Sequence, residues 1–343
     1  MKQSDVKTGN AARQQKKHAR PFVVGDKPEG LVARLFRRRE IVLHPTVLVL
    51  ATYILLLLSK LIDIALINRE NEYYSIVLLQ MMIFLLPGAI WCKFSGEQYL
   101  SGLRLRMVRA DSLLLILSSA LLMASGGMLL TVLFGGPEAL SGSFSLYDTF
   151  ISKDNGTVPN TLYLVLAYAV LPAVCEEFVF RGILCREYER GGVLRAVLLS
   201  ASFFALLHFD LANLPVYLFA GIILAMTLYA TRSLFGAILA HFLYNIFGLF
   251  GQSYMSNLYQ MTGNSSLFLF LIAAVCLISA ALFCGEASRL YRRYLYRAYS
   301  ADYRQPTLKG AAALRASYLN VLRQPSAILC LAVYILALII SWI

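Results

Sequence analysis

Charged residues are scarce in this chain. Only 15% of its 343 residues are Asp, Glu, Lys or Arg, whereas 59% are apolar. This balance excludes an ordinary soluble domain, and no stretch of the chain has the composition of one. Apolar runs of about 17 to 25 residues, the length that crosses a hydrocarbon core of about 30 Å, recur from end to end. The composition therefore predicts an all-α, polytopic transmembrane helical bundle.

Acidic residues are scarcer than basic ones, 19 against 31, which gives a formal net charge of +12. An excess of this size could serve nucleic-acid binding. The basic residues, however, lie in loops and tails beside apolar runs, where they favour membrane orientation and contact with anionic lipid. We therefore expect anionic lipid, and no nucleic acid, as a partner of these basic segments.

Two further absences narrow the class. The six cysteines form no CxxC pair, so neither a disulfide framework nor a zinc ribbon is expected. The chain is polar for about its first forty residues, so no cleavable signal peptide is apparent. We expect the first apolar span itself to direct the chain to the membrane.

The apolar runs predict about eight core spans and one extra C-terminal span. They lie at residues 44–66, 75–91, 112–134, 161–189, 193–208, 215–230, 236–250, 267–284 and 326–343. The chain then divides into a basic cytoplasmic tail with an interfacial helix (1–40), an intramembrane core (41–285), a basic amphipathic segment (286–325) and a C-terminal transmembrane helix (326–343). In the basic amphipathic segment, a tyrosine-rich stretch from Ser288 predicts a cytoplasmic interfacial helix.

The basic residues also predict an orientation. With the N-terminus in the cytoplasm, every Arg-rich loop falls on the cytoplasmic side of these spans. The expected location is therefore multi-pass and integral, in a bacterial plasma membrane. Within the fourth span, Pro172 lacks the amide proton that an α-helix needs, and we expect a kink there.

Two adjacent carboxylates, Glu176 and Glu177, and one arginine, Arg181, interrupt the fourth apolar run. A charge at the bilayer centre costs from about 3 to more than 10 kcal/mol, so ionisable residues there indicate a functional site. Glu177 and Arg181 are one helical turn apart with the acid first, the favourable order for an ion pair. Glu176 is turned by about 100° from Glu177, which leaves it freer to face water.

Further polar residues lie in the fifth and seventh apolar runs. Counted from the expected cytoplasmic helix ends at about 1.5 Å per residue, Glu176 lies about 16 Å deep, His208 about 20 Å and His241 about 12 Å. These depths overlap, so groups from three helices are expected to meet in one buried site. His241 and Asn245 share a helix face and present an imidazole and an amide together, which suits an oxyanion or a substrate carbonyl.

Each feature also has a structural interpretation. A Glu–Arg pair in one helix neutralises itself, and a lone histidine in an apolar span is often a hydrogen-bonded packing residue. His241 with Asn245 could join two helices, which contributes about 0.6 to 2 kcal/mol. The combination of all these groups on neighbouring spans favours a functional site.

Three motifs carry a family resemblance. Glu176-Glu177-xxx-Arg181, Phe204-xxx-His208 and His241-xxx-Asn245, in this order, resemble the motifs of the CAAX prenyl protease and bacteriocin-processing (abortive-infection) family of intramembrane endopeptidases. The resemblance covers about residues 163–250 and leaves out the N-terminal tail and the ninth span. It implies an all-helical core, with the site on the fourth, fifth and seventh spans, that cuts peptide bonds near the membrane.

The resemblance implies a glutamate-dependent mechanism without a cofactor. Glu176, assisted by His208, takes a proton from water, while His241 and Asn245 stabilise the tetrahedral oxyanion. Glu177 and Arg181 complete the predicted catalytic set. Phe204 is predicted to bind substrate.

A zinc-dependent variant stays open, with His208, His241 and a glutamate as ligands. We favour the metal-free version because Asn245 is a poor zinc ligand but a good oxyanion donor. The HExxH signature of zinc peptidases is also absent from the sequence.

The expected substrate is a membrane protein or a lipidated peptide, such as one with a prenylated CAAX-like end. Two other classes would use the same residues differently. The resemblance also covers immunity or scaffold proteins that bind a membrane partner without cutting it, and buried carboxylates serve proton- or ion-coupled transporters as well. The complete set of three motifs favours catalysis over both.

Overall fold

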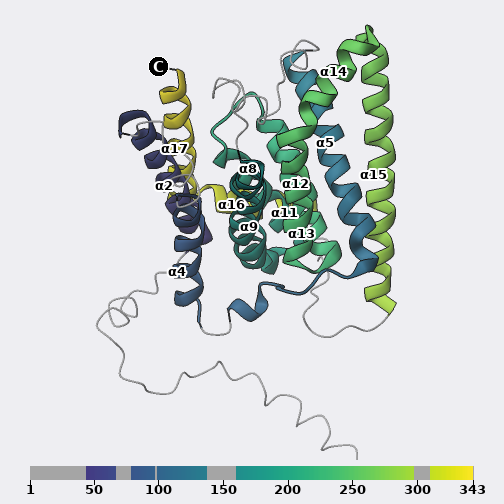
Figure 1. Cartoon of the computed structure of the whole chain (residues 1–343). Helices are drawn as coiled ribbons and strands as arrows, with labels where there is room; N and C mark the ends of the chain where they lie inside the picture. The colour runs from purple at the N-terminus through teal and green to yellow at the C-terminus, as the bar shows by residue number, and fades with distance from the viewer. Residues whose placement is uncertain (1–43, 67–78, 97–98, 137–159, 297–309, 343) are drawn as a thin grey trace, which may run out of the picture. The chain divides into compact units, whose positions relative to one another are not determined.

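The structure is a computed structural model, and it describes residues 44–66, 79–96, 99–136, 160–296 and 310–342. Every element in these residues is a helix, which confirms the predicted fold class. The chain divides into two units, Met1–Leu43 and His44–Ile343. The first unit, with the predicted basic tail and interfacial helix, lies outside the described residues. The second unit contains all of the described residues, and Figure 1 draws its helices as coiled ribbons.

The second unit contains α-helices joined in places by π and 3₁₀ turns. The α-helices are α2 (Pro45–Leu66), α4 (Leu86–Phe94), α5 (Leu113–Gly135), α8 (Thr161–Val165), α9 (Leu171–Glu177), α10 (Cys185–Tyr188), α11 (Val193–Leu207), α12 (Leu214–Thr231), α13 (Leu234–Ile246), α14 (Gln252–Thr262), α15 (Ser265–Tyr296), α16 (Ala311–Leu322) and α17 (Pro325–Trp342). The π turns are η2 (Met81–Leu85), η5 (Leu166–Val170), η6 (Phe178–Leu184) and η8 (Phe247–Gly251). Short 3₁₀ turns are η3 (Leu100–Gly102), η4 (Ala110–Ser112) and η7 (Glu189–Gly191).

Within the described residues, five helical stretches are long and apolar enough to cross a membrane: Ala110–Gly135, Thr161–Gly191, Leu214–Thr231, Leu234–Gly251 and Ser265–Arg292. A sixth results if α16 and α17, bent by 71° at their junction, count as one span. The shorter apolar helices are Pro45–Leu61, Met81–Phe94 and Val193–Leu207. A polytopic bundle is thus confirmed, and the count of nine spans stays a prediction.

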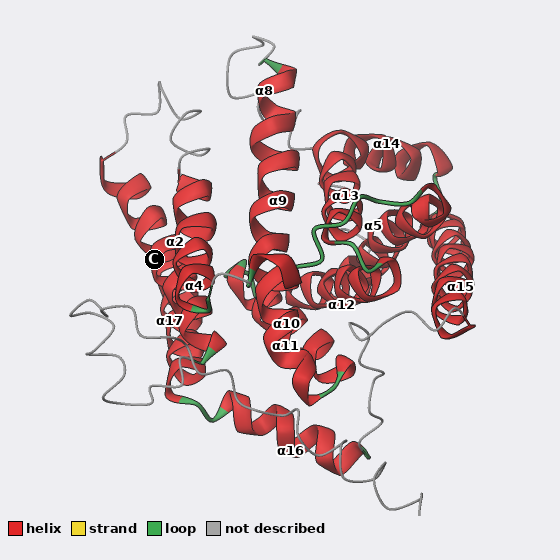
Figure 2. Ribbon diagram, turned by 90° about the horizontal axis from the view of Figure 1, so that it is seen from below, coloured by secondary structure: helices red, strands yellow, loops and turns green. Residues whose placement is uncertain are grey.

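The helices that carry the three motifs lie together. Figures 1 and 2 show α2, α4 and α17 on one side of α9, α10 and α11, and α5, α13 and α15 on the other. α11 and α12 pack as an antiparallel hairpin, and α13 packs against both α9 and α12. Because lipid offers no hydrogen bonds, these apolar segments satisfy their backbone groups as helices.

The fourth predicted span is helical from Thr161 to Gly191 but contains two π turns. The π turn η5 ends just before Pro172, and the π turn η6 begins directly after the two carboxylates. A wider turn before a proline relieves the clash between its ring and the carbonyl one turn earlier. The disturbance expected at Pro172 thus takes the form of π turns, which often occur at functional sites.

α11 is too short to cross a membrane by itself. Its 15 residues rise about 22 Å, less than the hydrocarbon thickness of about 30 Å. If α11 begins at the membrane edge, as its sequence predicts, the turn between α11 and α12 lies at membrane depth, where irregular backbone must be buried in protein. Asp210 satisfies part of this turn by accepting hydrogen bonds from the backbone N–H (3.1 Å) and the side-chain amide (2.8 Å) of Asn213.

α15 corrects one expectation. The sequence predicted that the eighth span ends at residue 284 and that an interfacial helix starts at Ser288, but one helix of 32 residues runs from Ser265 to Tyr296. No proline interrupts this stretch, and the single Gly285 costs only about 1 kcal/mol in a helix. The pair Glu286–Arg289, three residues apart, further supports the helix where its sequence becomes polar.

A short connection before α5 ties several helix ends together. Arg104 forms an ion pair of 2.8 Å with Glu189 after α10, and its carbonyl accepts a 2.9 Å hydrogen bond from the N–H of Leu234. Arg289 of α15 donates to the carbonyl of Asp111 at 2.6 Å. Nearby, burial and a hydrogen bond to Glu187 raise the pKa of Tyr99, which keeps its hydroxyl protonated as a donor. The basic connections around residues 104, 190 and 289 thus lie on the same side of the bundle.

This arrangement sharpens a topology prediction. Reporter fusions placed after Arg109, Arg190 and Arg297 should all report the cytoplasm, because basic loops are retained on that side. The ion pair between Arg104 and Glu189 requires the first two positions to agree with each other whatever the orientation. An external signal from any one of the three fusions would refute the predicted topology.

Candidate active site

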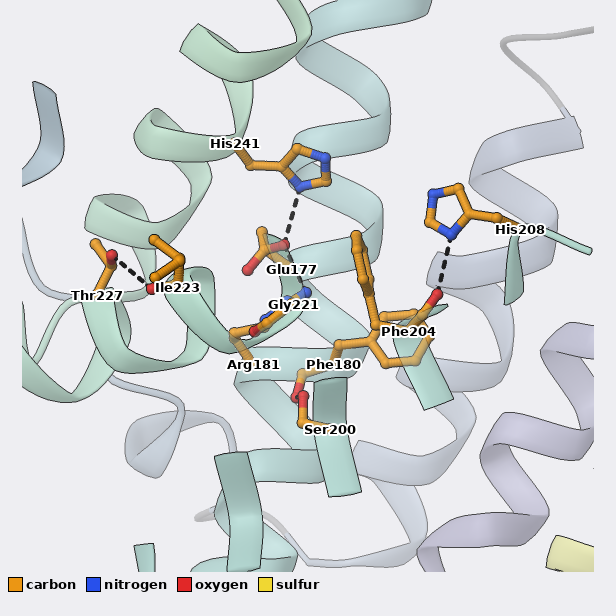
Figure 3. A network of polar contacts seen from close by, with 10 residues as sticks. All are labelled: Glu177, Phe180, Arg181, Ser200, Phe204, His208, Gly221, Ile223, Thr227 and His241. Carbon is orange, nitrogen blue, oxygen red and sulfur yellow. Dashed lines mark hydrogen bonds and ion pairs between the residues drawn. The ribbon is translucent and has the colours of Figure 1, made fainter. Parts of the chain in front are cut away.

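Glu177 is the centre of a buried polar cluster (Figure 3). Its Oε1 accepts a hydrogen bond from Nη1 of Arg181 at 2.8 Å and one from Nδ1 of His241 at 2.9 Å. The side chains of Glu177 and Arg181 are fully buried, and that of His241 is 6% exposed. The predicted ion pair within the helix is thus confirmed. The contact with His241 adds a link from α9 to α13 that sequence reasoning missed.

Arg181 is held by a second helix as well. Its Nη2 donates to the carbonyl of Gly221 on α12 at 3.0 Å, and its Cζ lies 4.4 Å from the centre of the Phe204 ring. Pairing of its charge and bonds to its N–H groups stabilise a buried guanidinium. Both Nη atoms of Arg181 are bonded, whereas its Nε has no partner in the described residues. Gly221 allows this approach, because it lets α12 pack closely against Ala201 of α11.

Replacing Gly221 by Ala is expected to lower the free energy of unfolding by about 1 to 3 kcal/mol. An added Cβ would lie 2.9 Å from the backbone Cα of Ala201, so the two helices would have to separate. That shift would also move the Gly221 carbonyl away from Arg181 and lower activity. Thermal unfolding in detergent measures the change.

Gly285→Ala in α15 is the matched control, because nothing lies within 4 Å of an added Cβ there. Ala favours a helix over Gly by about 1 kcal/mol, so this variant should be as stable as the wild type or more stable. Equal losses in the two variants would contradict the close-packing explanation.

His208 stands at the C-terminal end of α11 with a fixed orientation. Its Nδ1 lies 3.0 Å from the carbonyl oxygen of Phe204, which can only accept, so Nδ1 carries the proton. The imidazole stacks on the ring of Tyr217 with centroids 3.8 Å apart. Nε2 of His208 forms no hydrogen bond within the described residues.

Phe204 lies between the two histidines (Figure 3). Its ring meets His208 edge-on at 5.0 Å and His241 at 5.8 Å between centroids, and it is 2% exposed. The ring therefore sets the spacing of the imidazoles. Its predicted role in substrate binding stays a prediction.

Glu176 and Asn245 occupy the edge of the cluster. Glu176 is half-buried and has an Oε2 that is buried without a hydrogen-bond partner in the part of the chain described. The amide of Asn245 donates to the carbonyl of Ala169 in η5 at 3.4 Å. Asn245 therefore lies one turn beyond His241 and is not bonded to it.

Two residues of this site, Tyr217 and Gly221, were not predicted from the sequence. Nothing in the sequence marks Tyr217 as a site residue, because aromatic residues are common in apolar spans. A glycine inside a transmembrane helix does indicate close helix packing, so Gly221 could have been found as a packing site. Its bond to Arg181 could not.

The segment that carries the cluster also matches a known family.

Residues 158–247 match the family model described as type II CAAX prenyl endopeptidase, Rce1-like.

The Rce1-like segment runs from just before α8 to the end of α13 and contains all seven predicted site residues. The resemblance predicted from the three motifs is thus confirmed over this segment. Searches of curated proteins and of solved structures gave no match. The match supports a protease, and with the apolar helices it supports an integral, multi-pass membrane protein.

The predicted site residues do not form a metal site as their side chains stand. Within the described residues, no group of three His, Cys, Asp or Glu side chains lies close enough to hold a metal ion. Nδ1 of His241 is bonded to Glu177, and the Phe204 ring lies between His241 and His208. The ligand set that a zinc mechanism needs therefore does not fit as the side chains stand, and independence from metal stays a prediction.

A cavity of about 400 Å³ lies elsewhere, between α11, α12 and the last turns of α15. Its lining residues are Val193, Val197, Met226, Tyr229, Ala230, Ala287, Ser288, Tyr291 and Arg292. It shares no residue with the polar cluster, so we assign it no part in the chemistry of the site.

Proposed function

We propose that the chain is an intramembrane endopeptidase in which Glu176 activates water to hydrolyse a peptide bond of a membrane-associated, prenylated CAAX-like substrate. The observation that carries the proposal is which atoms of the cluster are left unbonded. Within the described residues, Oε2 of Glu177 and Nε of Arg181 lack a partner, but both of these side chains are fully buried. Oε2 of the half-buried Glu176 and Nε2 of both histidines make no hydrogen bond among these residues either, whereas Nδ1 of each histidine is engaged. These three atoms are free to act on water and substrate.

Glu176 accepts and returns the proton of the attacking water, and His208 orients that water. A water molecule held between the Glu176 carboxylate and Nε2 of His208 gives its proton to the carboxylate as it attacks the scissile carbonyl. The carboxylic acid then returns the proton to the leaving nitrogen. Because Nδ1 of His208 donates to the Phe204 carbonyl, the imidazole presents Nε2 as the acceptor that orients the water.

The oxyanion is stabilised from α13. As an imidazolium, His241 donates from Nε2, while Glu177 accepts from Nδ1 and stabilises the positive charge. The amide of Asn245 has a second N–H besides the one that bonds Ala169. Donors of this kind are worth roughly 10² to 10³ in rate each.

The proposal is tested with purified protein in liposomes and a peptide that ends in a farnesylated CAAX sequence. We expect release of the C-terminal tripeptide, and much slower release from the same peptide without the prenyl group. Release of no product from either peptide, under conditions where the protein is folded, would reject the proposed function.

Independence from metal is a separate prediction. Activity should persist after dialysis against a strong chelator, because the proposed steps use only side chains of this chain. Metal content of the active protein, measured by mass spectrometry, should be far below one ion per chain. One zinc per chain, with activity lost on its removal and restored by zinc alone, would establish the zinc variant instead.

A further inference from the structure

The residue that comes after His208 has an unusual backbone conformation. Phe209 has a φ of 50°, in the left-handed region. At the position after a helix end this region usually belongs to Gly, as at Gly263 after α14. A left-handed conformation is unfavourable for a residue with a side chain, because its Cβ comes close to the following carbonyl oxygen. A bulky residue therefore persists there only when its side chain is held by its surroundings.

Two helices outside the Rce1-like segment hold this side chain. Phe209 is 5% exposed, and its ring lies 5.7 Å from that of Tyr53 on α2 and 6.3 Å from that of Tyr334 on α17. Nζ of Lys60, also on α2, lies 5.3 Å from the centre of the same ring. The ring of Phe209 is thus enclosed by contacts from both helices.

α2 also contacts the end of α11 through a hydrogen bond, and it is joined to α17. The hydroxyl of Tyr53, fully buried, donates to the carbonyl of Phe203, one residue before the carbonyl that binds His208. α2 and α17 are joined to each other, since Sγ of Cys330 donates to the carbonyl of Thr46 at 3.8 Å. Figure 1 shows them side by side.

We propose that α2 and α17 form a clamp on Phe209 that positions His208 for its part in the proposed reaction. In this clamp, the rings of Tyr53 and Tyr334 hold the ring of Phe209. The clamp fixes the backbone at the point where α11 ends, while the Phe204 carbonyl and Tyr217 fix the imidazole itself. The ninth predicted span then has a role that the matched segment does not supply. This inference rests on the proposed function for its kinetic part only.

The test removes one ring of the clamp. Tyr334→Leu should lower kcat at least 10-fold while KM stays within about twofold, because Tyr334 positions a residue and does not contact the substrate. Tyr334→Phe should retain wild-type turnover, because the Tyr334 hydroxyl has no partner in the described residues and only the ring is used. Phe209→Gly, which removes the second ring and the backbone strain together, should repeat the effect of Tyr334→Leu.

A readout independent of catalysis accompanies the kinetics. Hydrogen–deuterium exchange at C2 of the His208 imidazole, followed by mass spectrometry, should be at least threefold faster in Tyr334→Leu and Phe209→Gly than in the wild type. Exchange at His44 should not change. Phe268→Ala is the stability control, because Phe268 is 1% exposed and packs on Tyr259, apart from the clamp. It should lower stability without changing exchange at His208.

The outcomes separate the two proposals. Faster exchange at His208 in a protein that never cleaves would leave the clamp standing and reject the proposed function. Wild-type turnover and wild-type exchange in folded Tyr334→Leu and Phe209→Gly would overturn the clamp and leave the proposed function standing. A loss of turnover equal to that of Phe268→Ala, with unchanged exchange, would also overturn it.

Discussion

Glu177→Gln is expected to lower the free energy of unfolding by about 3 to 5 kcal/mol, the usual loss when one partner of a buried ion pair is removed. The glutamine would leave the buried guanidinium of Arg181 without a counter-charge, although its bond to the Gly221 carbonyl remains. Activity should fall too, because the carboxylate also orients His241. A carboxylate in that position is worth up to about 10⁴ in rate in a serine protease triad.

A double variant can separate the loss of stability from the loss of activity. Glu177→Gln combined with Arg181→Met removes both charges, and replacing a whole buried pair by apolar groups is often neutral or stabilising. Stability should therefore recover by more than half, whereas activity should not, because His241 still lacks its carboxylate. Thermal unfolding and the peptide assay measure the two quantities. If activity recovers together with stability, Glu177 has only a structural role.

The part of this cluster that lies on one helix could be predicted from the sequence. The pairing of Glu177 with Arg181 follows from their spacing, and their contact of 2.8 Å confirms it. The meeting of three motif helices followed from the depth estimates. The bond between Glu177 and His241 could not be predicted, because it depends on how α9 and α13 are rotated about their axes. Apolar faces on all sides of a membrane helix leave that rotation undetermined.

The remaining differences between the structure and the sequence-based predictions have local and long-range causes. Periodicity does not distinguish an α-helix that continues past the membrane edge from one that ends there, so the uninterrupted course of α15 was missed. The left-handed Phe209 leaves no mark in the sequence, because its conformation is imposed by Tyr53 and Tyr334 from helices far along the chain. Sequence motifs identified the candidate reacting groups, and packing determines how they are held.

Glu176 should behave differently from its neighbour, although composition treats the two glutamates as equals. Glu176 has no ion-pair partner at hydrogen-bond distance, and its Oε2 is buried without a bond in the described residues. Glutamine keeps its shape and removes the charge, so Glu176→Gln should leave thermal stability in detergent nearly unchanged. It also removes the base that accepts the proton of water, a role worth roughly 10² to 10⁴ in rate. Cleavage should therefore be abolished.

The comparison of the two glutamine variants decides the assignment. In the same detergent and with the same peptide, Glu176→Gln should be the inactive but stable protein, and Glu177→Gln the less stable one. Arg181→Ala should resemble Glu177→Gln, because it breaks the same buried pair from the other side. If Glu176→Gln keeps near-normal turnover, or is the less stable of the two, the general base and the structural carboxylate have been assigned the wrong way round. A protein that only binds a membrane partner would not cleave the peptide even as the wild type, and Glu176→Gln would leave its thermal stability unchanged.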